Sequence, residues 1–159
     1  MRYYLAYGSN LNIKQMDRRC PGARVVGTAE IRGYELLFKG SHTGAYLTIG
    51  RCEGGIVPAG VWAVDEKEEE SLDWFAGCPN FYYKTNMTVS VKHLDGKIES
   101  AECFVYIMHE DRVFGVPALQ YVHTCLEGYK DFGFNEEFLS EAAKKSGSGF
   151  PGKEERKEK

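Results

Sequence analysis

The sequence has no long apolar run and no excess of positive charge. Nothing in its 159 residues approaches the roughly 20 consecutive apolar residues that a membrane-spanning helix needs. The first residues, Met1–Tyr7, lack the apolar stretch of a secretory signal. The 20 Lys and Arg residues face 23 Asp and Glu, so the net charge is −3 and gives no general electrostatic reason to bind nucleic acid. We therefore expect a cytoplasmic protein with neither a nucleic-acid nor a membrane partner.

The sequence also lacks the residue spacings that hold metal ions. Its five cysteines include no Cys-x-x-Cys pair, which favours reduced, buried and unreactive thiols. Its four histidines are scattered, and no pair sits at ligand spacing with a cysteine or carboxylate. We expect no metal site.

The residues that are present suit one globular domain. Hydrophobic residues make up 43% of the chain and charged residues 27%, a balance typical of a soluble core rather than of a disordered chain. From residue 146 onward the chain is rich in Gly, Ser, Lys and Glu and has little apolar content. We expect a folded domain over residues 1–145 and a flexible charged tail over residues 146–159.

Short β-branched or aromatic runs separated by turn residues predict a small, mostly antiparallel β-barrel. A first strand is expected near Tyr3–Ala6, and two long strands, Phe81–Val91 and Ile98–Met108, are joined by hairpin chemistry at residues 94–97. Between them lie four shorter expected strands: Arg24–Ile31, Tyr34–Phe38, Tyr46–Ile49 and Gly60–Val64.

Helices are expected at the periphery of this barrel, which makes the fold class α+β. Asn12 can cap a short helix that ends near Arg19, and Asp65 can cap a second helix that Gly77 closes. Two further segments, Pro117–Tyr129 and Asn135–Lys145, predict a C-terminal helical pair.

The turn Tyr7-Gly8-Ser9-Asn10-Leu11 is the strongest candidate for a site. It lies between a strand and a helix, so several backbone N–H groups can point at one place, as an anion or an oxyanion requires. Gly8 allows a ligand close to the backbone, and Ser9 and Asn10 offer hydrogen bonds. The same residues also suit a simple capped turn.

The segment Tyr4–Leu11 resembles the opening motif of the γ-glutamylcyclotransferase family. The resemblance extends over about residues 1–145, through an ordered set of later segments: Tyr34–Phe38, Gly60–Val64, Ser71–Asp73, Phe81–Lys84, Phe104–Met108 and Pro117–Gly133. It implies a compact β-barrel with the turn at the end of the first strand.

The resemblance implies an intramolecular acyl transfer. The α-amine of a γ-glutamyl group attacks its own γ-carbonyl, which releases an amine and 5-oxoproline. The N–H groups of Gly8, Ser9 and Asn10 would bind the carboxylate or the developing oxyanion. The reaction needs no cofactor. The resemblance also implies that four tyrosines converge on the substrate: Tyr7, Tyr83, Tyr106 and Tyr121.

The position of the family's general base is occupied by alanine. The family places a glutamate on the short acidic helix, and here that motif reads Leu72-Asp73-Trp74-Phe75-Ala76-Gly77. Ala76 is expected to point inward with Leu72 and Phe75, which lie on the same helix face. A methyl group accepts no proton, and losing a positioned base costs about 10²–10⁴-fold in rate.

Three explanations of Ala76 remain open from the sequence: a substitution introduced to trap a ligand, a natural relative without activity, or a base moved to another side chain. Asp73, three residues earlier, shares the general face of Ala76 and is the first candidate for a moved base. Arg18 or Arg19 is a candidate electrostatic anchor. The corresponding functions are a disabled cyclotransferase, a non-catalytic binder of a small γ-glutamyl or amino-acid-like ligand, or a related lyase. No oligomeric state is assigned.

Overall fold

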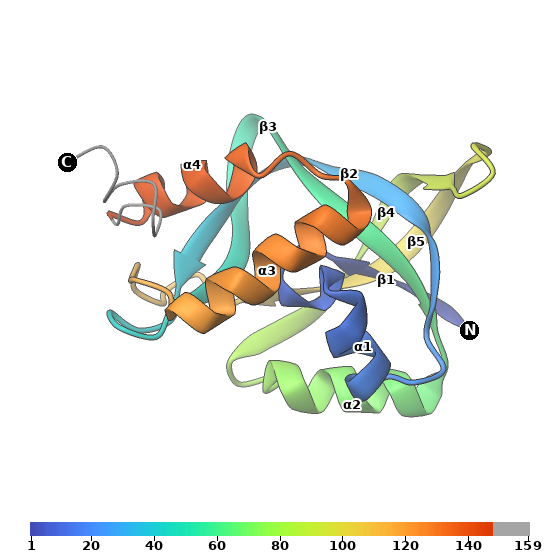
Figure 1. The fold of residues 1–159 in the computed structure, drawn as a ribbon, viewed down its shortest axis with the longest axis horizontal. Coiled ribbons are helices and arrows are strands. Elements are labelled where there is room, and N and C mark those ends of the chain that lie inside the picture. Colours follow the sequence, from blue (N-terminus) through green and yellow to red (C-terminus); the bar gives the residue numbers. More distant parts are fainter. Residues whose placement is uncertain (148–159) are drawn as a thin grey trace.

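Five strands form a closed barrel in the computed structural model, which describes residues 1–147 (Figure 1). The order around the barrel is β1-β3-β2-β4-β5. All neighbouring pairs are antiparallel except β1 and β5, which pair in parallel. The strands are β1 (Arg2–Ala6), β2 (Arg24–Lys39), β3 (Tyr46–Val64), β4 (Tyr82–His93) and β5 (Ile98–Met108). The mostly antiparallel barrel and the α+β class are therefore confirmed.

The four short strands expected between residues 24 and 64 are in fact two long ones, so that part of the prediction is wrong. Strands β2 and β3 pair along almost their whole length, with register shifts between Val25 and Gly27 and between Arg32 and Tyr34. Gly33 lies at the second shift with a φ of 83°, a conformation that glycine adopts readily. A glycine read from sequence as a strand end is therefore a bulge that bends a continuous strand.

The helices begin and end largely where the capping residues predict. A 3₁₀ helix, η1 (Ser9–Leu11), leads into α1 (Ile13–Arg19), where the Asn12 side chain accepts a hydrogen bond from the Gln15 N–H. Helix α2 (Glu66–Ala76) begins with a capping box between Asp65 and Glu68 and ends at Gly77. Within residues 1–147, no helix has both the length and the apolar character to cross a membrane.

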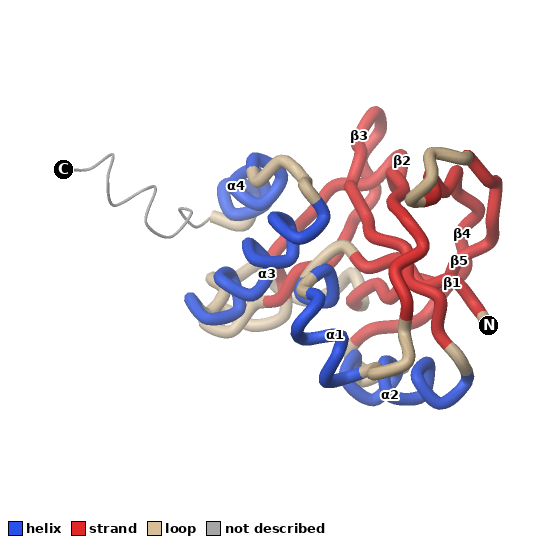
Figure 2. Tube along the Cα trace, turned by 45° about the vertical axis from the view of Figure 1, so that its right-hand side comes forward, coloured by secondary structure: helices blue, strands red, loops and turns tan. Residues whose placement is uncertain are grey.

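The two C-terminal helices are α3 (Leu119–Phe132) and α4 (Glu137–Lys145). They cover the barrel on the side opposite the turn that joins β4 and β5 (Figures 1 and 2). Helix α3 packs against η1, and α4 packs against β2. The folded part of the chain reaches Ser146, which is buried and whose hydroxyl accepts a hydrogen bond from the Phe38 N–H at 2.9 Å. The rest of the expected tail, residues 148–159, lies outside the described residues.

Candidate functional site

A cavity of about 320 Å³ opens where β1 ends and the chain enters η1. Its walls come from the turn after β1, from α1, α2 and α3, and from the adjoining ends of β3, β4 and β5. Tyrosine is the most frequent side chain in these walls. The lining residues are Tyr4, Tyr7, Gly8, Ser9, Asn10, Gln15, Arg19, Tyr46, Leu47, Leu72, Phe75, Ala76, Phe81, Tyr82, Tyr106 and Tyr121.

The turn after β1 has backbone donors to offer. The carbonyls of Gly8 and Ser9 accept hydrogen bonds from the N–H groups of Leu11 and Asn12, at 3.0 and 2.9 Å, which closes the 3₁₀ helix. No group within residues 1–147 accepts a hydrogen bond from the N–H of Gly8, Ser9 or Asn10. All three residues line the cavity. The arrangement can therefore bind an anionic oxygen, as the strand–turn–helix pattern predicts.

Asn10 connects the turn to three neighbouring elements. Its Oδ1 accepts hydrogen bonds from Gln15 at 3.0 Å and from Arg19 at 3.1 Å, both on α1. Its Nδ2 donates to the Tyr4 hydroxyl at 3.0 Å, and its carbonyl accepts from the Trp62 indole at 3.1 Å. Because every polar atom of the Asn10 carboxamide is used inside the protein, its main role in the structure is to hold the turn.

Helix α3 fixes the turn from behind. Gly128 lies so close to it that a Cβ built there would be 2.6 Å from the Asn12 nitrogen and 2.8 Å from the Leu11 Cβ. The Asn12 Nδ2 also donates to the Thr124 carbonyl of α3 at 3.1 Å. Leu11 is fully buried in this contact and does not line the cavity. Its contribution is to seat the turn against α3.

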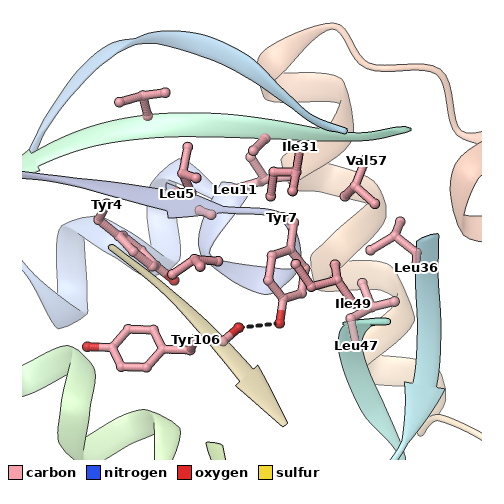
Figure 3. Packing of buried hydrophobic residues seen from close by; sticks show 14 of the residues in the cluster. Tyr4, Leu5, Tyr7, Leu11, Ile31, Leu36, Leu47, Ile49, Val57 and Tyr106 are labelled. Carbon is pink, nitrogen blue, oxygen red and sulfur yellow. Dashed lines mark hydrogen bonds between the residues drawn. The ribbon is translucent and has the colours of Figure 1, made fainter. Parts of the chain in front are cut away.

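Six tyrosines line the cavity wall, and most of their hydroxyls are already hydrogen-bonded to the protein. Tyr7 donates to the Tyr106 carbonyl at 2.7 Å (Figure 3), and Tyr82 donates to the Leu47 carbonyl at 2.7 Å. The Tyr121 hydroxyl accepts from the Leu47 N–H at 3.0 Å. These bonds brace the wall, so the rings shape the cavity more than the hydroxyls contact a ligand.

Burial keeps these tyrosines neutral. Desolvation raises the pKa of Tyr4 to about 12 and raises the pKa values of Tyr7, Tyr82 and Tyr121 further above their ordinary value. Desolvation also raises the pKa of Tyr106, and its hydrogen bond to the Asp73 carboxylate adds to the rise. None of these phenols is therefore a ready proton acceptor near neutral pH.

The last turn of α2 forms the wall across from the turn after β1. Leu72, Phe75 and Ala76 all line the cavity, as the helix spacing predicts. The guanidinium carbon of Arg19 lies 4.2 Å from the centre of the Phe75 ring. This wall offers a methyl group, an aliphatic side chain and an aromatic ring, and no proton acceptor.

Asp73 is near the cavity but faces other partners. Its Oδ1 accepts a hydrogen bond from the Tyr106 hydroxyl at 2.6 Å and from the Lys84 ammonium at 3.0 Å. Lys84 also contacts Glu69 at 2.6 Å, and Glu69 contacts Arg2 at 2.6 Å. The four charges form a balanced network behind Tyr106, and Asp73 is not among the lining residues.

The structure brings together most of the residues expected at the site, with Tyr83 outside it. The Tyr83 hydroxyl donates to Glu110, and its ring lies beside His109, away from the cavity. Side chains alternate along a strand, so the neighbouring Tyr82 takes the inward place. Arg19, one of the two candidate anchors from the sequence, lines the cavity. Gln15 also lines it and was not predicted, although its i, i+4 spacing from Arg19 on α1 puts both on one helix face.

The sequence pattern of the family described as "Gamma-glutamyl cyclotransferase, AIG2-like" matches residues 4–123, the part of the chain that forms this cavity. The chain belongs to this family. The solved structure of a gamma-glutamyl cyclotransferase superposes on this family member with a TM-score of 0.71 and 27% identity, covering 94% of this chain and 88% of the other. The crystal structure of an uncharacterised Homo sapiens protein gives a TM-score of 0.70 and 26% identity over 94% of this chain and 88% of the other.

Curated relatives of this gamma-glutamyl cyclotransferase family member match a shorter segment. Gamma-glutamylaminecyclotransferase B of Danio rerio is 32% identical over 76 residues, which cover 48% of this chain and 40% of that protein. Gamma-glutamylaminecyclotransferase of Rattus norvegicus is 32% identical over 79 residues, which cover 48% of this chain and 53% of that protein. The matches therefore span about half the length of these relatives.

Proposed function

We propose that this protein binds a small γ-glutamyl or related acid in the cavity and that it does not cyclise this ligand at the rate of its family. The observation that supports the proposal is the composition of the cavity wall. Within residues 1–147 the wall keeps the turn with its free N–H groups, and it contains no carboxylate. Binding and proton abstraction are therefore separated in this chain.

The chemistry of the reaction explains why one missing group matters so much. A γ-glutamyl amine carries an α-ammonium, which attacks its γ-carbonyl only after it loses a proton. The turn can still hold the ligand in a cyclising geometry, and positioning contributes a large share of the rate in such reactions. Without a positioned base, the remaining rate is about 10²–10⁴-fold lower. Ala76 stands where the family resemblance puts that base.

A general base moved to another side chain is less well supported by the composition of the cavity wall. Asp73, the nearest carboxylate on α2, is bonded to Tyr106 and Lys84 rather than directed into the cavity. A proton passed stepwise to Asp73 through Tyr106 would first ionise the Tyr106 phenol, and burial opposes this by raising the pKa of Tyr106. The proposal therefore treats Asp73 as a residue that positions Tyr106.

Calorimetric binding and product analysis on one sample test the proposal. Because the curated relatives are named gamma-glutamylaminecyclotransferases, γ-glutamyl amines are the first compounds to titrate. We expect binding without appreciable release of 5-oxoproline over many hours. Rapid release by the unaltered chain would overturn the proposal, and loss of that release in Asp73→Asn would then assign the moved base. Absence of binding by every γ-glutamyl amine and by 5-oxoproline would remove the ligand class.

A further inference from the structure

We propose that the cavity selects carboxylic acids without a charged α-nitrogen, such as lactam acids and des-amino γ-amides, over zwitterionic γ-glutamyl amines. This inference rests on the proposed function and narrows its ligand class. The decisive feature is the charge of the wall. Among the lining residues of the described chain, Arg19 is the one that carries a charge, and that charge is positive.

Arg19 has no acidic partner within residues 1–147. Its contacts are the Asn10 Oδ1 at 3.1 Å and the face of the Phe75 ring, both uncharged. Arg19 is partly buried, and this burial lowers the pKa of its guanidinium. A guanidinium stays protonated under these conditions and favours a carboxylate as its partner.

Tyr4 adds a second unused donor. Arg19 can only donate, so the Asn10 atom facing it is the oxygen, and the Asn10 nitrogen must donate to the Tyr4 hydroxyl. The Tyr4 proton therefore remains available. Tyr4 is buried and lines the cavity, and no acceptor for this proton is found in the described chain. A buried donor of this kind calls for an acceptor on the ligand.

The wall offers an ammonium no comparable partner. The nearest carboxylates, Asp73 and Glu69, are neutralised by Lys84 and Arg2 and lie behind Tyr106. At the end of α2, the carbonyls of Asp73 and Trp74 already accept hydrogen bonds from Cys78 and Gly77. The remaining acceptors are neutral oxygens of hydroxyl and amide groups.

A bound zwitterion would therefore place an unpaired ammonium close to the Arg19 guanidinium. Like charges at short range in a partly desolvated cavity repel one another, whereas a simple carboxylate pairs with Arg19 and adds no second cation. In the family pattern, the glutamate at the position of Ala76 would supply the missing negative charge. Its loss changes what the cavity binds as well as what it catalyses.

A matched pair of ligands tests this inference by isothermal titration calorimetry. The first is γ-glutamylpropylamide, and the second is the monopropyl amide of glutaric acid, which differs only by lacking the α-amino group. We expect the des-amino compound to bind about tenfold more tightly or better. 5-Oxoproline should bind well and its uncharged primary amide weakly. Arg19→Gln should lower the affinity for the des-amino compound and for 5-oxoproline about tenfold. Arg18→Gln is the matched control on the same helix.

Ala76→Glu should reverse the order of the pair, because it restores a negative charge to the wall. Equal or tighter binding of the zwitterion by the unaltered chain would overturn the inference while leaving the proposed function intact. Binding unaffected by Arg19→Gln would also overturn it. If none of the four compounds binds, the inference and the proposed function both fail.

Discussion

The two walls of the cavity differ in how strongly they are bonded to the rest of the fold. The wall at the turn after β1 is tied by hydrogen bonds to α1, to β3 and, through Asn12, to α3. The wall at the end of α2 has apolar side chains at its surface, and Phe75 is 45% exposed. A change in the first wall disturbs several elements at once, whereas a change at Ala76 alters one side chain.

This difference fits the proposal that this protein keeps the binding turn without the base. The turn is held by the same contacts that hold the barrel and its helices together. Position 76 lies in the last helical turn, before the Gly77 cap, and its methyl group is partly buried against the core. Under the proposed function, ligand binding depends on contacts that also hold the fold, whereas catalysis depends on a single side chain.

Alkaline pH should have the largest effect on the free energy of unfolding, because it destabilises the tyrosine-rich wall of the cavity. Six tyrosines of the cavity wall and core have pKa values raised above 10 in the folded state: Tyr4, Tyr7, Tyr82, Tyr106, Tyr121 and Tyr129. Their stabilising effect is complete below pH 10 and is lost as the pH rises, because the unfolded chain releases these protons first. The free energy of unfolding should fall by about 1.4 kcal/mol per pH unit for each tyrosine.

Urea unfolding between about pH 9 and pH 11 measures this loss, on the order of 5 kcal/mol in total. Tyr129→Phe is the matched control, since its buried hydroxyl has no hydrogen-bond partner within the described residues. This variant should be as stable as the unaltered protein at neutral pH and should lose the part of the pH slope that one tyrosine contributes. Ionisation of all tyrosines near pH 10 in the folded protein would contradict the prediction.

Gly128→Val should damage the contact between α3 and the turn. A Cβ at this position would lie 2.6 Å from the Asn12 nitrogen, so the helix or the turn must shift. We expect a loss of about 3 kcal/mol in the free energy of unfolding and weaker ligand binding. His123→Val, at an exposed position of the same helix, introduces the same side chain and should leave both quantities nearly unchanged. Equal stability of the two variants would mean that the turn does not depend on this close contact.

Asn10→Ala should have a smaller effect on stability and a clear effect on binding. The substitution removes the acceptor shared by Gln15 and Arg19 and leaves the buried Tyr4 hydroxyl without its donor. The expected cost is about 2 kcal/mol by urea unfolding. Asn86→Ala is the control, because Asn86 is exposed and makes one hydrogen bond, to Arg2. If ligand affinity survives in Asn10→Ala, the turn is held by other contacts than those described.

Ala76→Gln should have the smallest effect. The position is partly exposed at the end of a helix, so the free energy of unfolding should change by less than about 0.5 kcal/mol. Glutamine has the length of glutamate and no basic oxygen of comparable strength, so no 5-oxoproline should form. A loss of several kcal/mol would show that the α2 wall is as deeply built in as the turn, and the comparison of the two walls would fail.

The sequence predicted local structure well where a side chain acts on its own neighbours. Asn12 and Asp65 cap helices as expected, and the hairpin of β4 and β5 is in place. The long strands β2 and β3 were missed, because whether Gly33 ends a strand or bends it depends on the pairing partner.

The candidate site was predicted in outline, again where local sequence decides the structure. The turn and Ala76 could be placed because they follow from a motif and from helix spacing. The place of Tyr82 rather than Tyr83 in the cavity could not be predicted, since it depends on which face of β4 lines the cavity in the folded barrel. The pairing of Asp73 with Tyr106 and Lys84 joins three elements and leaves no trace in the local sequence.

The most direct test of the account is the rate of 5-oxoproline release from a panel of γ-glutamyl amines, measured for the unaltered chain and for Ala76→Glu at equal concentration. We expect release by the glutamate variant at a rate about 10² times that of the unaltered chain or higher. Ala76→Gln should match the unaltered chain. Release by the unaltered chain as fast as by Ala76→Glu would contradict the claim that this protein keeps the family's binding turn and lacks its base.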